Sequence, residues 1–142
     1  MIVVAAVIED HGSFLVTQRP EGTHLAGLWE FPGGKLEPAE THVQGLKREL
    51  REELDVDVDV GELLFHTAHE YADRSVALYF YRCVLAGAPH ALFGQQMRWV
   101  PRHDLSTLAF PPADEELIRR LVTAGSDPGT ERLNLASGQA PR

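Results

Sequence analysis

A pair of glycines followed by a glutamate-rich helix constrains this chain more than any other feature. Gly33 and Gly34 allow the backbone to turn sharply or to approach a ligand closely. The residues that follow predict a helix over about 41–54. Thr41 with Gln44 three positions later is a capping-box pattern, which is typical of a helix start.

This predicted helix has two chemically different faces. An apolar face recurs at helical spacing and consists of Val43, Leu46, Leu50 and Leu54. A second face holds carboxylates spaced i, i+3 and i+4, namely Glu49, Glu52 and Glu53. Like charges at this spacing oppose the helix by roughly a few tenths of a kcal/mol per pair. A hard cation such as Mg²⁺, which prefers carboxylate oxygens, would remove that penalty.

The rest of the chain predicts one α+β domain. Its 142 residues suit a single core. Strand-like segments are expected at 2–9, 13–19, 56–60, 63–71, 76–85 and 95–100. A second helix should follow Pro111-Pro112-Ala113. We expect the domain to span 1–124 and the remainder, 125–142, to form a flexible C-terminal tail, because it holds few large apolar residues. Pattern alone does not settle the strand order.

Composition narrows the range of partners. A formal net charge of −8 argues against binding to duplex nucleic acid, which requires a basic surface. The chain has no apolar run near the roughly 20 residues that span a membrane. A single cysteine, Cys83, rules out an internal disulfide and fits a cytoplasmic protein.

The central stretch brings together glycines, Lys35 and a set of carboxylates. Such carboxylates would bind Mg²⁺ or Mn²⁺, and phosphate oxygens would complete the metal shells. Metal-assisted phosphoryl or nucleotidyl transfer to water follows from that chemistry. The alternative is a solvated acidic helix face beside an ordinary glycine turn. Glu40 and the adjacent pair Arg48-Glu49 favour the metal site.

The spacing also resembles a known family motif. Gly34, five residues, Glu40, seven residues and then Arg48-Glu49-Leu50-Arg51-Glu52-Glu53-Leu54 closely resembles the Nudix box. Segments similar to MutT-type members of the Nudix family extend the match over roughly 2–122, at 17–20, 24–35, 73–74, 98–100 and 110–114. The resemblance implies an α/β/α sandwich with a mixed sheet. It also implies hydrolysis of a nucleoside triphosphate to the monophosphate and pyrophosphate, which removes oxidised nucleotides from the pool.

The resemblance implies roles for individual residues. The metals would be held by the Gly33 carbonyl, Glu49, Glu52 and Glu53. Glu40 and the box glutamates would position or deprotonate the attacking water, and Arg48 would orient a box glutamate through an ion pair. Arg19 and Lys35 would contact phosphates. The base would meet the Phe31 backbone, Arg74 and Asp114.

Two positions depart from the family pattern. Asp55 stands where the family expects a glycine that ends the helix in a left-handed conformation, so we expect a modest loss of stability. Phe93 stands where MutT-type proteins often carry a further glutamate that binds metal or activates water. Either the box acids suffice, or His90, Gln95 or an acid from elsewhere takes that role.

Asp114 is the main candidate for base selection. An ionised aspartate only accepts hydrogen bonds, and the guanine edge offers two adjacent donors, N1–H and NH₂. This favours a guanine-type base such as 8-oxo-guanine over cytosine, which would require a protonated aspartate. The alternative is that Asp114 caps the second helix.

Two classes of function follow. The first is a Mg²⁺-dependent nucleoside triphosphate pyrophosphohydrolase, with 8-oxo-dGTP as the first substrate and CTP-like pyrimidine nucleotides as the second. The other is a non-catalytic nucleotide-binding module, which Phe93 and Asp55 suggest and the intact glutamates oppose. Whether the protein is a monomer or a homodimer stays open.

Overall fold

One central strand joins the two halves of a mixed seven-stranded sheet in the computed structural model, which describes residues 1–126. β1 (Ile2–Asp10) pairs in parallel with β6 (Ser75–Leu85) and antiparallel with β4 (Gly33–Lys35). At its end β1 pairs antiparallel with β2 (Ser13–Gln18). β3 (Trp29–Glu30) and β7 (Met97–Pro101) pair with β2, and β5 (Val58–Glu70) pairs with β6. The strand order β3-β2-β1-β6-β5 follows.

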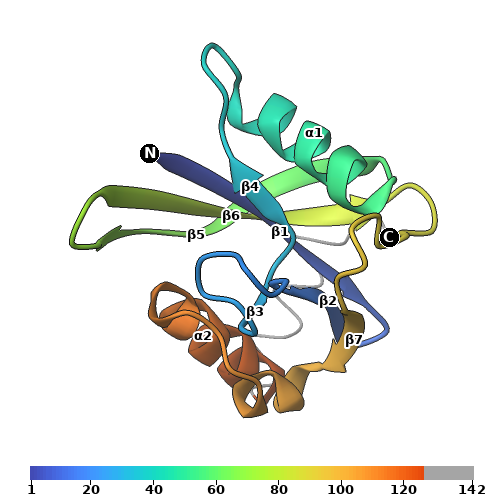
Figure 1. Cartoon of the computed structure of the whole chain (residues 1–142). Helices are drawn as coiled ribbons and strands as arrows, with labels where there is room; N and C mark the ends of the chain where they lie inside the picture. The colour runs from blue at the N-terminus through green and yellow to red at the C-terminus, as the bar shows by residue number, and fades with distance from the viewer. Residues whose placement is uncertain (127–142) are drawn as a thin grey trace.

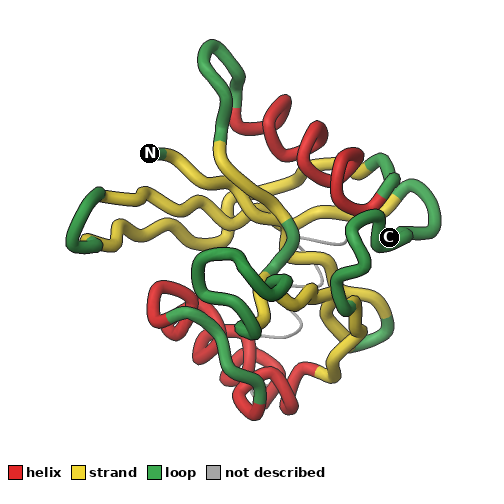
Figure 2. Tube along the Cα trace, viewed as in Figure 1, coloured by secondary structure: helices red, strands yellow, loops and turns green. Residues whose placement is uncertain are grey.

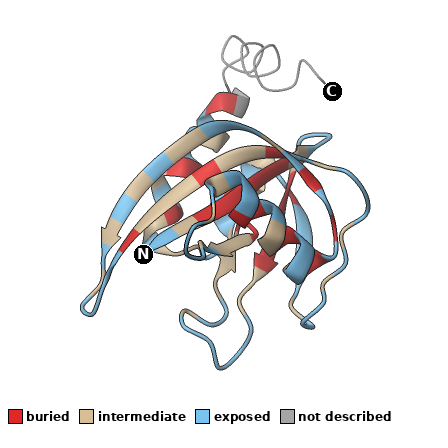
Figure 3. Cartoon of the chain, turned by 90° about the horizontal axis from the view of Figure 1, so that it is seen from above, coloured by how far each residue is buried: buried red, intermediate tan, exposed pale blue. Residues whose placement is uncertain are grey.

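β1 is buried on both faces because helices cover both sides of this sheet. Its alternate residues enter two separate cores. Val4, Ala6 and Ile8 pack with α1 (His42–Leu54). Ala5 and Val7 pack with the 3₁₀ helix η1 (Arg102–Thr107) and with α2 (Glu115–Ser126). Figure 1 shows α1 above the sheet and α2 below it, and Figure 3 shows buried stretches along the strands and the helices. The predicted α+β sandwich is confirmed.

The predicted glutamate helix is confirmed together with both of its ends. Thr41 accepts a hydrogen bond from the Gln44 backbone, and the Gln44 side chain accepts one from the Thr41 backbone. At the other end Asp55 is left-handed, with φ 52° and ψ 45°. Its N–H donates to the Arg51 carbonyl at 3.1 Å. Val43 differs from the prediction, since it is 42% exposed. It shares the stripe of the buried leucines, but the burial of that stripe begins at Leu46.

Gly33 and Gly34 form a strand instead of the predicted turn. They pair with Ala5 and Val4 of β1. A β-carbon on Gly33 would lie 2.1 Å from the Val4 carbonyl oxygen, so only glycine allows β1 to approach this closely. The close backbone approach that the sequence predicts is therefore made to a neighbouring strand.

Three further boundaries differ from the sequence-based expectation. The predicted strands at 56–60 and 63–71 are one strand, β5, with register shifts on either side of Leu63 that keep it paired with β6. The second helix begins later, because the 3₁₀ turn η2 (Pro112–Asp114) precedes α2. The predicted domain end at 124 falls inside α2, and most of the predicted tail, 127–142, lies outside the described residues. Across 1–126, no helix is long and apolar enough to cross a membrane.

Candidate active site

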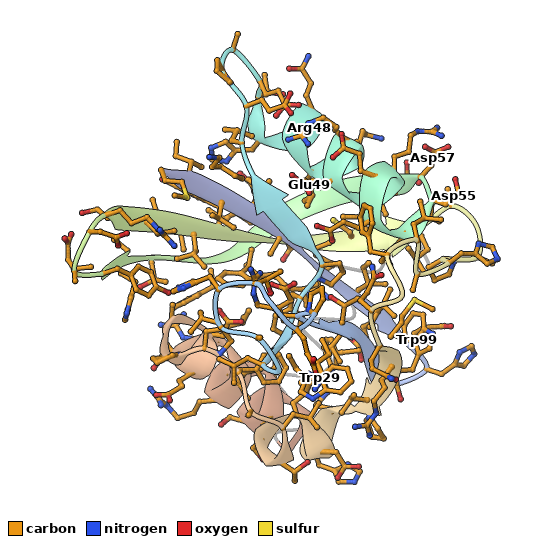
Figure 4. The ribbon with its side chains drawn as sticks, in the orientation of Figure 1. Trp29, Arg48, Glu49, Asp55, Asp57 and Trp99 are labelled. Atoms are coloured by element: carbon orange, nitrogen blue, oxygen red, sulfur yellow. The ribbon has the colours of Figure 1, made fainter. Side chains whose placement is uncertain are left out.

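A cavity of about 240 Å³ lies beside β4 and is open to solvent. Six of the predicted site residues line it: Arg19, Phe31, Gly33, Lys35, Arg74 and Asp114. They come from segments far apart in the chain, which Figure 2 shows as strands and loops that meet between the two helices. Glu49 of α1 points toward β4, whereas Asp55 and Asp57 lie at the far end of the helix (Figure 4). The phosphate-binding and base-binding candidates therefore share one cavity, with the helix glutamates at its edge.

Arg48 connects the predicted catalytic carboxylates. Its Nε donates to Glu40 Oε2 at 2.6 Å and its Nη2 donates to Glu40 Oε1 at 3.0 Å, so this contact is bidentate. Its Nη1 lies 3.1 Å from both Glu49 Oε2 and Glu52 Oε1. Nη2 also donates to the Lys35 carbonyl at 3.0 Å. The expected ion pair between Arg48 and a helix glutamate is present. The contacts of Arg48 with Glu40 and Lys35 also fix α1 to the segment that precedes it.

The electrostatics of these carboxylates differ. Hydrogen bonds from Arg48, and then from the Glu37 backbone, lower the pKa of Glu40 below its ordinary value. Burial raises the pKa of Glu53, and the neighbouring carboxylates Glu49 and Glu30 raise it further. Glu52 is more open, with 54% of its side chain exposed. The structure thus brings Glu49 and Glu53 together and leaves Glu52 at the rim, where Arg48 links it to Glu49.

Glu30 joins the site although the sequence analysis did not assign it a role. Its Oε1 accepts a hydrogen bond from Arg19 Nη1 at 3.0 Å. Burial raises the pKa of Glu30, Arg19 opposes that shift, and Glu49 adds to it. The signal in the sequence is a charged residue between Trp29 and Phe31, directly before the glycines. Glu30 lies on β3, which pairs with β2, whereas Glu49 and Glu53 lie on α1. No local spacing in the sequence therefore relates Glu30 to the helix glutamates.

The structure also shows what surrounds Phe93. Its side chain is 64% exposed and lines a small pocket together with Arg19, Glu30 and Glu53. Gln95 donates to the backbone carbonyl of Glu53 at 3.2 Å, so its amide holds the loop against the end of α1. The acid from elsewhere that approaches the helix glutamates is Glu30.

Asp114 lines the end of the main cavity where Pro111 and Ala113 also lie. It is only 4% exposed, and within residues 1–126 its carboxyl forms no hydrogen bond or ion pair. Burial, and then the charge of Glu30, raise the pKa of Asp114 to about 7. The capping alternative is wrong, because no backbone N–H of α2 donates to this carboxyl in the described part of the chain. Phe31 walls this end and stacks on Phe110 with ring centroids 5.5 Å apart.

Besides Arg19, which pairs with Glu30, the positive side chains Lys35 and Arg74 line the cavity. Lys35 is exposed on β4, next to Gly33 and Gly34. Arg74 lies at the turn between β5 and β6, with its guanidinium 5.6 Å from the centre of the Tyr71 ring. Its Nη1 is 3.4 Å from Asp73 Oδ2. Two cations are thus available to a ligand that fills the cavity.

The donor chemistry at the helix suits a divalent cation. Glu49 and Glu53 offer hard carboxylate oxygens, and the backbone of Gly33 lies within hydrogen-bonding reach of Glu53 through its N–H. In residues 1–126 no three acidic, histidine or cysteine side chains are grouped closely enough to hold a metal by themselves. Oxygens from a substrate or from water would therefore complete the shell, as is usual for Mg²⁺.

Comparisons with known proteins agree with this arrangement. The family model described as NUDIX domain matches residues 3–120. The chain is 39% identical over 122 residues to an 8-oxo-dGTP diphosphatase of Haemophilus influenzae, covering 84% of this chain and 90% of the relative. It is also 39% identical over 121 residues to a CTP pyrophosphohydrolase of Escherichia coli, with the same coverage. The solution structure of the E. coli ORF135 protein matches with a TM-score of 0.78 and 36% identity, covering 89% of this chain and 92% of that one.

Proposed function

Because this chain belongs to the Nudix family, we propose that it is a metal-dependent hydrolase that cleaves a nucleoside triphosphate to the monophosphate and pyrophosphate. The observation that carries the proposal is the Arg48 network, which holds Glu40, Glu49 and Glu52 together and ties them to β4, a strand that lines the cavity. Such a network positions carboxylates for chemistry on a bound phosphate chain.

Each residue then has a distinct task. Glu49 and Glu53, with the Gly33 carbonyl and with Glu52 from the rim, would hold the divalent cation. Mg²⁺ is the metal we propose, with Mn²⁺ as a substitute. When bound, the cation supplies Lewis-acid activation and charge neutralisation at the phosphates. Lys35 and Arg19 would bind phosphate oxygens directly.

Water activation requires a carboxylate that stays ionised and correctly placed. Glu40 meets the first requirement, since Arg48 holds its pKa below the ordinary value. Glu30 and Glu53 line the same pocket as Phe93. Glu30 is therefore the acid best placed to replace the further glutamate that MutT-type proteins often carry at the position of Phe93. We propose that these two acids, with the box glutamates, orient the attacking water.

The base would occupy the end of the cavity formed by Phe31, Arg74 and Asp114. Relatives of equal identity are named for 8-oxo-dGTP and for CTP, so the proposed substrates are nucleotides with a guanine-type or a cytosine base. A guanine-type substrate would make this a nucleotide-pool sanitising enzyme. We propose the cytoplasmic nucleotide pool as its place of action.

The test is pyrophosphate release from a panel of triphosphates, with Mg²⁺, with Mn²⁺ and with neither. Glu53→Gln should lower kcat by about 100-fold or more while the protein stays folded, because one carboxylate of the Glu49–Glu53 pair is lost. Glu62→Gln, an exposed glutamate on β5, is the matched control. Tight nucleotide binding without turnover in the wild type would favour the non-catalytic module instead.

A further inference from the structure

Asp114 is a buried carboxyl with no partner at a place where a ligand would meet it. It lines the same cavity as Lys35 and Gly33. It is 4% exposed, and no other group in residues 1–126 hydrogen-bonds its carboxyl. Its oxygens are not among the fully enclosed polar atoms without a partner, so they open onto the cavity, where a bound ligand would meet them.

The charged groups around Asp114 leave it without a dedicated cation. The titratable side chains that share its cavity are Arg19, His24, Glu30, Lys35, Tyr71 and Arg74. The N-terminus of Met1 also reaches the cavity, and Glu115 and Glu116 follow Asp114 in the chain. Arg19 is already paired with Glu30, and Arg74 lies against Tyr71 and Asp73. The second carboxyl, Glu30, acts on Asp114 with the same sign as burial does.

We propose that Asp114 recognises two kinds of base, one in each of its protonation states. As a carboxylate it accepts from N1–H and the exocyclic NH₂ of a guanine-type base. As a carboxylic acid its O–H donates to N3 of cytosine, while its other oxygen accepts from the N4 amino group. The preferred base therefore shifts toward cytosine as pH falls and toward guanine as pH rises. This inference rests on the proposed function, in which the cavity binds a nucleotide.

A preference for guanine over cytosine requires that Asp114 is ionised. Near neutral pH the two forms coexist, because burial and Glu30 raise the pKa of Asp114 to about 7. If each base requires one form, the ratio of cytosine to guanine affinity falls about 100-fold between about pH 6 and about pH 8, from the protonated fractions alone.

The test is metal-free binding of dCMP, dGMP and 8-oxo-dGMP by calorimetry between about pH 6 and about pH 8. Titration of the monophosphate group, with a pKa of about 6, is common to the three ligands and cancels in the ratio. The wild type should show the fall of about 100-fold. Asp114→Asn, whose amide offers a donor group and an acceptor at every pH, should bind the three ligands with a ratio of affinities that does not change with pH.

Asp59→Asn is the matched control, since Asp59 is an exposed aspartate on β5 outside the cavity, and its ratio should follow the wild type. A constant ratio in the wild type would overturn the inference, as would an unchanged slope in Asp114→Asn. Turnover of triphosphates at each pH separates base recognition by Asp114 from the proposed hydrolase function. Hydrolysis with a pH-independent base ratio defeats the inference alone, whereas pH-dependent binding without hydrolysis defeats the proposed function alone.

Discussion

Gly34 lies directly against the carboxylate of Glu49. A β-carbon on Gly34 would be 2.4 Å from Glu49 Cδ and 2.5 Å from each of its carboxylate oxygens. A β-carbon on Gly33, its neighbour in β4, would instead collide with the backbone of β1. The two glycines therefore serve different purposes: Gly33 permits the strand pairing, and Gly34 leaves room for a site carboxylate.

Alanine substitutions should separate these purposes. Gly34→Ala should lower kcat by about 10-fold or more with a small loss of stability, because the flexible Glu49 side chain is displaced. Gly33→Ala should lower the free energy of unfolding by about 2 kcal/mol or more, since backbone must move. In Gly87→Ala the new β-carbon would lie 3.8 Å from Val56, so it serves as the control. Equal loss of stability in Gly33→Ala and Gly34→Ala, measured by denaturant unfolding, would contradict this division.

The shape of the Arg48 guanidinium matters as well as its charge. Lysine cannot form the bidentate contact with Glu40 and also reach Glu49 and Glu52. Arg48→Lys should therefore lower kcat by about 10- to 100-fold with a smaller change in KM for the triphosphate. Arg51→Lys is the control, because Arg51 is 63% exposed and pairs with Asp57, outside the network of site carboxylates. Full kcat in Arg48→Lys would show that charge alone suffices.

Asp55 imposes a stability penalty at the end of α1. Its left-handed backbone, at φ 52°, favours glycine. Asp55→Gly should raise the free energy of unfolding by about 1 kcal/mol, measured by urea denaturation. Asp57→Gly, where φ is not positive and the ion pair with Arg51 is lost, should bring no gain. If both variants behave alike, the left-handed cap is not the cause.

Stability should depend on pH through Asp114. Its pKa rises from 3.8 to about 7 on folding, so the folded state binds the proton more tightly than the unfolded state. The stability that comes from this tighter proton binding is fully present below the unfolded pKa of 3.8. It is lost as pH rises through the folded pKa of about 7. Asp114→Asn removes this titration, so its stability relative to wild type should rise by up to about 4 kcal/mol between about pH 4 and about pH 8. Denaturant unfolding across that range measures it, and a constant difference would contradict the raised pKa.

Local patterns predicted much of α1 and its surroundings. The capping box, the buried leucines and the Arg48 ion pairs depend on residues a few positions apart, or on one short loop between Lys35 and Thr41. Helical geometry fixes such neighbours once the helix forms. Val43 shows the limit, because it lies on the same stripe as the buried leucines and is nevertheless exposed.

Local sequence patterns did not predict the contacts between strands that are far apart in the chain. Glu30 approaches Glu53 only because β3 pairs with β2 while β4 pairs with β1. The same pairings make Gly33 and Gly34 a strand. Strand partners are not encoded in the spacing of either strand, so the sequence offered no means to choose them.

The sequence by itself determined the reaction type, because a helix places Glu49 and Glu53 on one face wherever that helix lies. Only the tertiary structure decided the state of the base-binding group. Asp114 is an ordinary aspartate in the sequence, and its raised pKa arises from burial beside Glu30, a residue brought there by the fold. Burial and long-range electrostatics are properties of the folded chain, and they set the protonation on which base recognition depends.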